Sequence, residues 1–162
     1  MSMTLYDFQS DSKKSDWRIV DDVVMGGRSD GSFSINSNGH GVFEGKVSLE
    51  NNGGFSSVRY QPDKTIIDGA SQVKIRLRGD GKTYQFRFKR KRSDYHSYVA
   101  SFQTSGEWEE ITIPLNQFKP AFRGRDLNME NFPGDQVEEI AFLIGNKKAE
   151  SFKLEIDYIK LF

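Results

Sequence analysis

Hydrophobic and polar residues alternate along much of the chain, and the clearest example lies near its middle. Val73, Ile75 and Leu77 are apolar, whereas Lys74 and Arg76 separate them. Successive side chains of a β-strand point to opposite faces, so this alternation predicts a strand with one buried and one solvated face.

The following segment repeats the pattern with aromatic residues. Tyr84, Phe86 and Phe88 alternate with polar residues, and the turn-forming run 79–82 separates the two segments. Two alternating segments joined by a short turn predict a β-hairpin.

Further strands are expected wherever short apolar or alternating runs are bounded by Gly, Asn, Asp or Pro. These segments are 32–35, 42–49, 56–60, 97–103, 110–115, 137–144 and 152–159. Single helical turns are expected at 63–67 and 116–118, because no longer segment has the apolar spacing of an amphipathic helix. About nine or more strands without crossover helices predict an all-β fold, an antiparallel β-sandwich or jelly roll.

The length and composition suit one folded domain over residues 1–162. The chain has 13 Phe, 6 Tyr and 2 Trp, which supply a core that a disordered chain would lack. Basic and acidic residues number 23 each, so the formal net charge is 0. No global field attracts nucleic acid or an anionic membrane, and neither is an expected partner.

The chain contains no Cys and only two His, His40 and His96. This excludes disulfides, thiolate metal sites and cysteine nucleophiles, and it leaves little material for a Ser–His hydrolase. We therefore expect a protein that is not an enzyme and that uses no cofactor or metal. Residues 1–10 lack the apolar stretch of a signal peptide, and no apolar run is long enough to span a bilayer. A cytoplasmic location is expected.

The first candidate binding segment contains Asp22, Met25, Gly26, Gly27 and Arg28. Backbone N–H groups around the Gly pair can form a concave nest for an anion, and the guanidinium can hold a carboxylate or phosphate. The alternative is a tight turn in which the Asp accepts hydrogen bonds from free amides and the Arg pairs with an acid. Turns use these residue types routinely, so composition alone favours the turn.

The second candidate segment contains Asn51, Asn52, Gly53 and Gly54, and Arg59 follows it. At a sandwich edge these amide and guanidinium donors suit a polyol, a carboxylate or the backbone of a partner. Alternatively, the Asn side chains satisfy their own loop. Both interpretations stay open.

The third candidate segment places Arg123 and Arg125 beside Phe122. Arg stacked on an aromatic ring is a recognition device and equally a structural clamp. We expect this loop and the two Gly-Gly loops to share one end of the sandwich. The basic run 87–92 has the composition of an RNA-binding surface, but its neighbouring aromatics alternate as core residues do, which favours a solvated hairpin end.

The two Trp residues are candidates to stack on a sugar ring. Trp17 begins an apolar segment, and Trp108 precedes Ile111 and Ile113. We expect Trp108 to begin a strand and to fill the core.

A series of motifs runs in order along nearly the whole chain. It comprises Trp17, D-V-V-M-G-G-R-S at 22–29, V-F-E-G at 42–45, S-L-E-N-N-G-G-F-S-S-V-R at 48–59, R-G-D-G-K-T-Y at 78–84, I-P-L at 113–115, F-R-G-R at 122–125 and F-K-L-E-I-D at 152–157. This series resembles the complex I intermediate-associated protein 30 family. Val23 stands where many relatives have Gly, which leaves the Gly pair that follows in place.

The resemblance implies a galactose-binding-like β-sandwich and a non-catalytic role as an assembly factor. In mitochondria the family is similar to a chaperone that helps to build the membrane part of respiratory complex I, the NADH:ubiquinone oxidoreductase. The chain lacks an Arg-rich presequence, so it resembles a stand-alone, bacterial-type member. The resemblance supplies no catalytic residues.

Two functions from different classes follow. The first is a protein-binding assembly factor that uses Arg28, Arg59, Arg123 and Arg125 to contact a partner, such as subunits of respiratory complex I. The second is a module that binds a small carbohydrate-like ligand through loops at one end of the sandwich.

Overall fold

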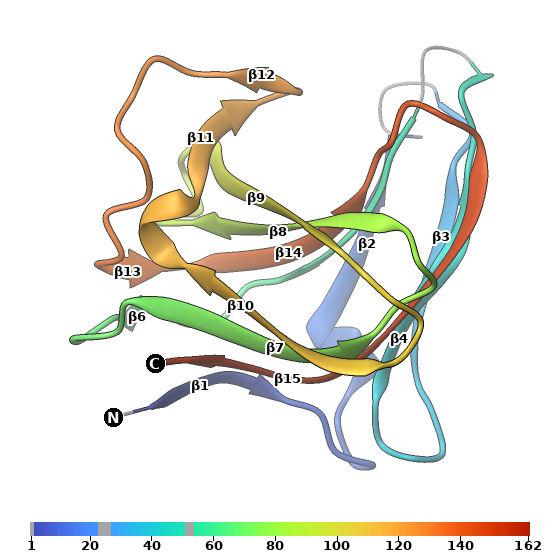
Figure 1. Cartoon of the computed structure of the whole chain (residues 1–162), viewed down its shortest axis with the longest axis horizontal. Helices are drawn as coiled ribbons and strands as arrows, with labels where there is room; N and C mark the ends of the chain where they lie inside the picture. Colours follow the sequence, from blue (N-terminus) through green and yellow to red (C-terminus); the bar gives the residue numbers. More distant parts are fainter. Residues whose placement is uncertain (1, 23–26, 51–53) are drawn as a thin grey trace.

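The strands form two large antiparallel sheets, drawn in Figure 1, and the computed structural model describes residues 2–22, 27–50 and 54–162. The six-stranded sheet has the order β10 (Trp108–Pro114), β7 (Gln72–Arg78), β15 (Glu150–Leu161), β4 (Gly41–Val47) and β3 (Asp30–Ile35), with β1 (Met3–Asp7) also paired to β15. The seven-stranded sheet has the order β12 (Arg125–Asp126), β11 (Lys119–Phe122), β9 (Ser97–Gln103), β8 (Thr83–Lys89), β14 (Glu139–Ile144), β5 (Ser56–Tyr60) and β2 (Trp17–Asp21). The short strands β6 (Thr65–Ile66) and β13 (Gln136–Val137) pair with each other, and 3-10 turns lie at η1 (Lys14–Asp16) and η4 (Leu115–Gln117).

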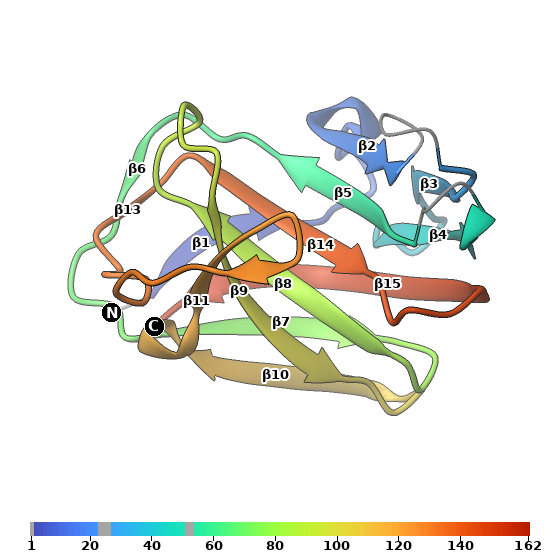
Figure 2. The ribbon, with the colours of Figure 1, turned by 90° about the horizontal axis from the view of Figure 1, so that it is seen from above.

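Figure 2 shows the seven-stranded sheet lying over the six-stranded one, and the core fills the space between them. Phe86, Phe88 and Phe142 of the seven-stranded sheet are 0% exposed, and the ring centroids of Phe86 and Phe142 lie 5.0 Å apart. Ile75 and Leu77 of β7 are equally buried from the other side. Burial of each such side chain contributes about 1.5–3 kcal/mol, so these rows fix which face of each strand points inward.

The predicted all-β class and antiparallel sandwich of jelly-roll type are confirmed. Every segment predicted to be extended contains a strand, and the turn predicted at 116–118 corresponds to η4. The helical turn predicted at 63–67 is wrong, because that segment contains β6. The segment stays extended since Ile67 is buried against the core and its N–H donates to the carbonyl of Asp135, at 3.0 Å. Nowhere in the described chain does a helix reach the length and apolarity needed to cross a membrane.

The predicted hairpin of segments 73–77 and 84–88 is also wrong. Strand β7 pairs with β10 and β15, whereas β8 pairs with β9 and β14. The connection at 79–82 therefore crosses from one sheet to the other. Two strands that face one core from opposite sides alternate in the same way as two strands of a hairpin, so the pattern alone does not distinguish them.

The crossing connection is held by one threonine at the end of β9. The hydroxyl of Thr104 accepts a hydrogen bond from the Gly81 N–H, at 3.1 Å, and donates to the Lys82 carbonyl, at 2.7 Å. A Cβ on Gly79 would lie 2.2 Å from the Cβ of Thr104, so no side chain fits there. Thr104 and the connection thus form one close-packed corner.

Trp108 lies outside the core, contrary to the prediction. It begins β10 directly opposite Arg78, and opposite residues of an antiparallel pair share one face. Its ring contacts the outer face of the six-stranded sheet, with centroids 4.7 Å from His40 and with the Arg76 guanidinium carbon 4.5 Å from the ring centroid. Ile113, an odd number of residues later, points inward and is 7% exposed.

We expect Thr104→Val to lower the free energy of unfolding by about 1–2 kcal/mol, because it removes both hydrogen bonds at the corner while keeping the shape of the side chain. Urea unfolding measures the change. Thr112→Val, the same substitution at an exposed position of β10, is the control. Equal effects of the two substitutions would show that Thr104 does not hold the corner.

Candidate functional site

One buried carboxylate ties the two Gly-containing loops together. Asp22 is 0% exposed, and its Oδ1 accepts a hydrogen bond from the Ser29 N–H at 2.9 Å. Its Oδ2 accepts from the Ser29 hydroxyl at 2.6 Å and from the N–H groups of Gly54 and Phe55 at 2.5 and 3.1 Å. A Cβ on Gly27 would lie 2.4 Å from the Asp22 side chain, so glycine is required where the loop closes. The side chain of Asp22 is therefore engaged within the protein.

The electrostatics of Asp22 follow from these contacts. Burial acts to raise the pKa of Asp22, but the hydrogen bonds from Ser29, Gly54 and Phe55 outweigh it and hold the pKa below its ordinary value. The ionised form is the one that the loops stabilise.

The other predicted site residues lie apart from one another. Met25, Gly26, Asn51, Asn52 and Gly53 fall outside the described residues. Arg28 is exposed just before β3, and Arg59 is half-buried in β5.

The predicted Arg123 and Arg125 are exposed at the turn between β11 and β12. The guanidinium carbon of Arg123 lies 5.2 Å from the Phe122 ring centroid. This turn belongs to one edge of the seven-stranded sheet, whereas β5 and β2 form the other edge. Figure 1 shows both edges rising on the same side of the sheet, so the three segments flank one face instead of forming one cluster.

Arg59 has a neighbour on that face that the sequence did not pair with it. The register of the sheet places Arg59 opposite Ala141 and Ala141 opposite Arg87. These three residues form one row across β5, β14 and β8, and the small central side chain leaves the space above it to the two guanidinium groups. The sequence alone shows Arg87 only as part of the basic run 87–92. It does not show that β14 lies between β5 and β8, and therefore it does not show that Arg87 and Arg59 are neighbours.

One of the two guanidinium groups is paired with a carboxylate. Arg59 Nη1 lies 4.0 Å from Glu139 Oε2, and the other oxygen of Glu139 accepts a hydrogen bond from Gln61 at 2.9 Å. Burial and, to a smaller extent, the charge of Arg59 lower the pKa of Arg87 to about 10, while Glu139 opposes the shift. Burial also lowers the pKa of Arg59. The row thus carries two partly desolvated cations, with one acid beside Arg59.

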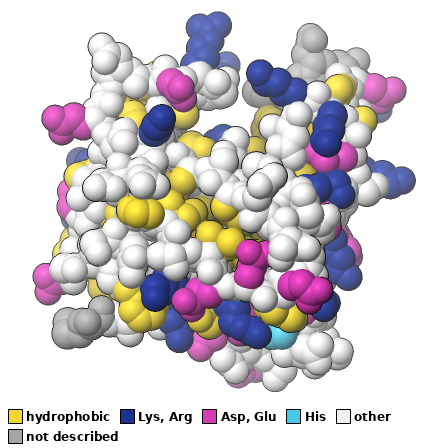
Figure 3. Space-filling model, in the orientation of Figure 1, with side chains coloured by type: hydrophobic (Ala, Val, Ile, Leu, Met, Phe, Trp, Pro, Cys, Tyr) yellow, Lys and Arg dark blue, Asp and Glu magenta, His cyan; other side chains and the backbone are white. Residues whose placement is uncertain are grey.

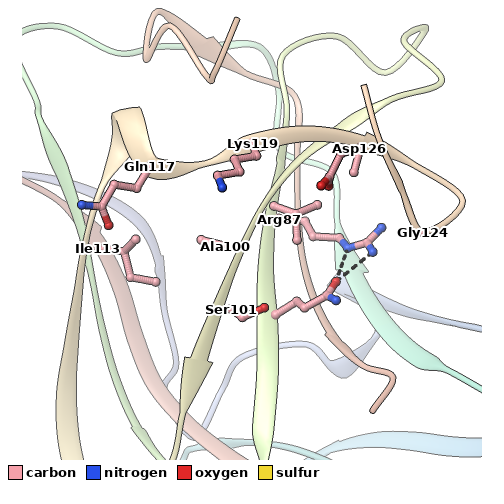
Figure 4. A pocket seen from close by; sticks show the side chains of 11 residues that line it. Arg87, Ala100, Ser101, Ile113, Gln117, Lys119, Gly124 and Asp126 are labelled. Atoms are coloured by element: carbon pink, nitrogen blue, oxygen red, sulfur yellow. Dashed lines mark hydrogen bonds between the residues drawn. The ribbon is translucent and has the colours of Figure 1, made fainter. Parts of the chain in front are cut away.

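Beside this row lies a cleft of about 440 Å³. It is lined by Gln85, Arg87, Val99, Ala100, Ser101, Ile113, Gln117, Lys119, Ala121, Gly124 and Asp126. Figure 4 shows Gln117 and Ile113 at one end of the cleft, the Arg87 guanidinium with Gly124 and Asp126 at the other, and Lys119 between the two ends. Figure 3 shows this view of the molecule hollowed between two lobes that carry Lys and Arg side chains.

None of the described residues that line the cleft is aromatic. The aromatic side chains of β8 and β14 point into the core, and Trp17 of β2 is buried at 4% exposure. Trp108 lies on the other sheet. Neither Trp is placed to stack on a ligand in the cleft.

A second polar cluster, on the outer face of the six-stranded sheet, is balanced in charge. Glu155 is 5% exposed and lies 2.9 Å from Asn36 Nδ2, 2.8 Å from His40 Nδ1 and 3.0 Å from Arg78 Nη2. Burial acts to raise the pKa of Glu155, and these contacts reverse the shift and lower it. The cluster satisfies itself, unlike the row of Arg59 and Arg87.

Comparison by sequence finds one family over almost the whole chain. The family model described as complex I intermediate-associated protein 30 matches residues 6–156. The mitochondrial complex I intermediate-associated protein 30 of Mus musculus is 23% identical over 181 aligned positions, which cover 98% of this chain. The chain spans 55% of the length of that curated relative.

Comparison by structure finds carbohydrate-binding modules. The family 11 module of the cellulosomal cellulase Lic26A-Cel5E of Clostridium thermocellum gives a TM-score of 0.74 at 18% identity, covering 100% of this chain and 94% of the module. The Clostridium thermocellum family 11 module in complex with a β-1,3-1,4-mixed-linked tetrasaccharide gives 0.70 at 17% identity, covering 99% and 95%. A mutant of the family 29 module CBM29-2 gives 0.60 at 8% identity, covering 100% and 91%. These likenesses show a shared galactose-binding-like β-sandwich fold.

We expect Asp22→Asn to lower the free energy of unfolding by about 2–4 kcal/mol near neutral pH, because an amide cannot accept all the hydrogen bonds that the carboxylate accepts. The pKa of Asp22 is lower in the folded chain than in the unfolded chain. The contribution of the carboxylate is therefore complete above about pH 4–5 and is lost as the pH falls further.

Denaturant unfolding of the wild type and of Asp22→Asn across acidic pH measures this difference. Asp68→Asn, at an exposed position, is the control. A difference between wild type and Asp22→Asn that stays constant as the pH falls below 4 would contradict the assignment of the ionised form.

Proposed function

The chain belongs to the complex I intermediate-associated protein 30 family, and from this premise we propose that it is a non-catalytic binding module of the assembly-factor type that holds a protein partner. The relative's name associates it with complex I, and we extend that association to this chain by taking subunits of respiratory complex I as the partner. The observation that carries the proposal is the outer face of the seven-stranded sheet. There Arg59 and Arg87 present two partly desolvated cations on either side of Ala141, and one acid, Glu139, pairs with Arg59.

The contact surface in this proposal combines the cleft with the edges that flank it. Arg28 lies at one edge, and Arg123 and Arg125 lie at the other. Arg is enriched among the residues that dominate binding energy at protein interfaces, because its planar donors hold carboxylates and its stem packs on apolar surface. Asp22 acts indirectly in this scheme, since its buried carboxylate accepts hydrogen bonds from Ser29, the residue next to Arg28, and from Gly54.

The second candidate function is binding of a small carbohydrate-like ligand. It is favoured by the fold that the chain shares with carbohydrate-binding modules and by a cleft whose size falls within the range of ligand pockets, about 300–1,000 Å³. Against it stands the lack of an aromatic side chain among the residues that line the cleft. A flat aromatic ring supplies much of the contact area in a typical sugar site.

The proposal is tested by affinity capture from detergent-solubilised membranes of the native organism, with bound proteins identified by mass spectrometry. We expect the wild type to recover complex I subunits. We expect the Arg28→Ala/Arg59→Ala double variant to recover an amount of these subunits that is lower by about fivefold or more, because it loses two guanidinium contacts. Lys46→Ala/Lys153→Ala removes the same charge from exposed positions on β4 and β15 and is expected to behave as the wild type. No enrichment of complex I subunits by the wild type would refute the proposed partner.

The carbohydrate alternative has a separate test. We expect a β-1,3-1,4-linked glucan tetrasaccharide, and a panel of neutral sugars and polyols, to leave the thermal unfolding midpoint unchanged at millimolar concentration. A saturable rise in the midpoint that is lost in Arg87→Gln would instead support a sugar site in the cleft.

A further inference from the structure

We propose that the cleft binds an acidic segment of a partner polypeptide in extended conformation, with one of its carboxylates held between Arg87 and Arg59. This inference rests on the proposed function and names the chemistry of the partner that the same site recognises. Three features carry it: an excess of positive charge, an unused donor edge on Arg87 and a strand edge without a partner.

The excess of charge is local, although the whole chain is neutral. Arg18 of β2 lies opposite Arg59, so three guanidinium groups belong to this part of the face. Glu139 is 5% exposed and is already engaged by Gln61 and by Arg59. Like charges drawn together in a partly dehydrated setting are unfavourable, and a second carboxylate would relieve the repulsion.

Arg87 is oriented but only partly used. Its Nε and Nη2 donate to Gln85 Oε1, at 3.0 and 2.8 Å, which fixes the plane of the guanidinium. Among the described residues, Nη1 of Arg87 has no hydrogen-bond partner. A planar fork held by a neighbouring amide, with donors left over, suits a carboxylate better than a neutral hydroxyl.

The floor of the cleft also offers backbone groups. Strand β11 pairs with β9 only at Ser97–Val99, whereas β9 continues to Gln103. In the described chain no strand pairs with residues 100–103 on the side away from β8. Ala100 and Ser101 of this segment line the cleft together with Ile113 of β10. An extended peptide can add to such an edge by main-chain hydrogen bonds, and the residues that flank the paired part can then cross the outer face of β8 to reach Arg87 and Arg59.

Two cations, Arg87 and Lys119, line the cleft. The register of the sheet places Val99 between Lys119 and Arg87, and Figure 4 shows Lys119 on one wall of the cleft. Two cations separated by a small apolar floor match an extended chain whose acidic side chains recur on one face. The lack of an aromatic platform argues against a sugar in the same place.

Isothermal titration calorimetry of the purified protein tests the inference, with a blocked peptide of alternating Thr and Glu as the probe. We expect saturable binding whose affinity falls as salt is raised. We expect Arg87→Gln and Arg59→Gln each to lower the affinity by about tenfold or more, because each removes a charge-assisted contact. Lys119→Gln, at an exposed position where folding is not at stake, is expected to weaken binding by about twofold to fivefold.

Three controls define specificity. A Thr and Gln peptide of the same length tests for charge, Lys46→Gln/Lys153→Gln tests for position, and a linear uronate trisaccharide tests for an acidic sugar. We expect no binding of the Gln peptide, unchanged affinity in the double Lys variant and no binding of the trisaccharide. The thermal midpoint of each variant shows whether it is folded.

The inference is overturned if the acidic peptide does not bind the folded wild type, if the Gln peptide binds as well, or if the Arg87 and Lys119 variants bind it unchanged. Binding of the trisaccharide without the peptide would overturn it in favour of an acidic sugar. These outcomes leave the proposed function standing if complex I subunits are still captured. Failed capture together with peptide binding would instead remove the proposed partner and keep the acidic ligand.

Discussion

Burial of the aromatic rings in β8 and β14 is the constraint on which the rest of the molecule depends. Phe86 packs against both Phe88 and Phe142, all three rings are fully buried, and strand side chains alternate between faces. Arg87, which lies between the two Phe residues, therefore has to point outward. A shift of one residue in the register of β8 would bury this guanidinium and expose two phenyl rings, which the core opposes by several kcal/mol, about 1.5–3 for each ring. The same burial that folds the sheet thus presents the cation.

The cationic row on the outer face costs stability and is sustained by this core. Arg59 and Arg87 repel each other across Ala141, and Glu139 compensates only part of the charge. The cluster around Glu155 on the opposite sheet shows the alternative, in which each buried charge has partners within the fold. When two sheets of one protein treat charge so differently, the unbalanced one is the better candidate for an external ligand.

The sequence predicted what depends on alternation and turn chemistry, and it missed what depends on which strands become neighbours. The strands, the sandwich class and the role of Asp22 as an acceptor for loop amides all followed from local patterns. The crossing at 79–82 did not, because β7 and β8 face the same core from different sheets. The prediction that Trp108 fills the core was wrong because Trp108 and Ile113 lie an odd number of positions apart along β10. Their side chains therefore point to opposite faces, and the side chain of Trp108 points outward. The pairing of Arg59 with Arg87 needed the insertion of β14 between β5 and β8, a long-range fact that no local pattern contains.

On the outer face of the seven-stranded sheet, the fold is that of carbohydrate-binding modules, whereas the side chains favour an acidic ligand. The side chains decide what the face can bind. The sandwich is shared with modules whose names specify carbohydrate, yet a shared fold at 18% identity transfers a backbone and not a site. In this chain the aromatic rings of β8 and β14 are buried in the core, so the cleft on the outer face is lined by guanidinium, ammonium and amide donors, one carboxylate, Asp126, and small apolar residues. Such donors discriminate by charge and by planar geometry instead of by stacking. The fold that occurs in carbohydrate-binding modules is thereby suited, in this chain, to an acidic partner without any change in the order of its strands.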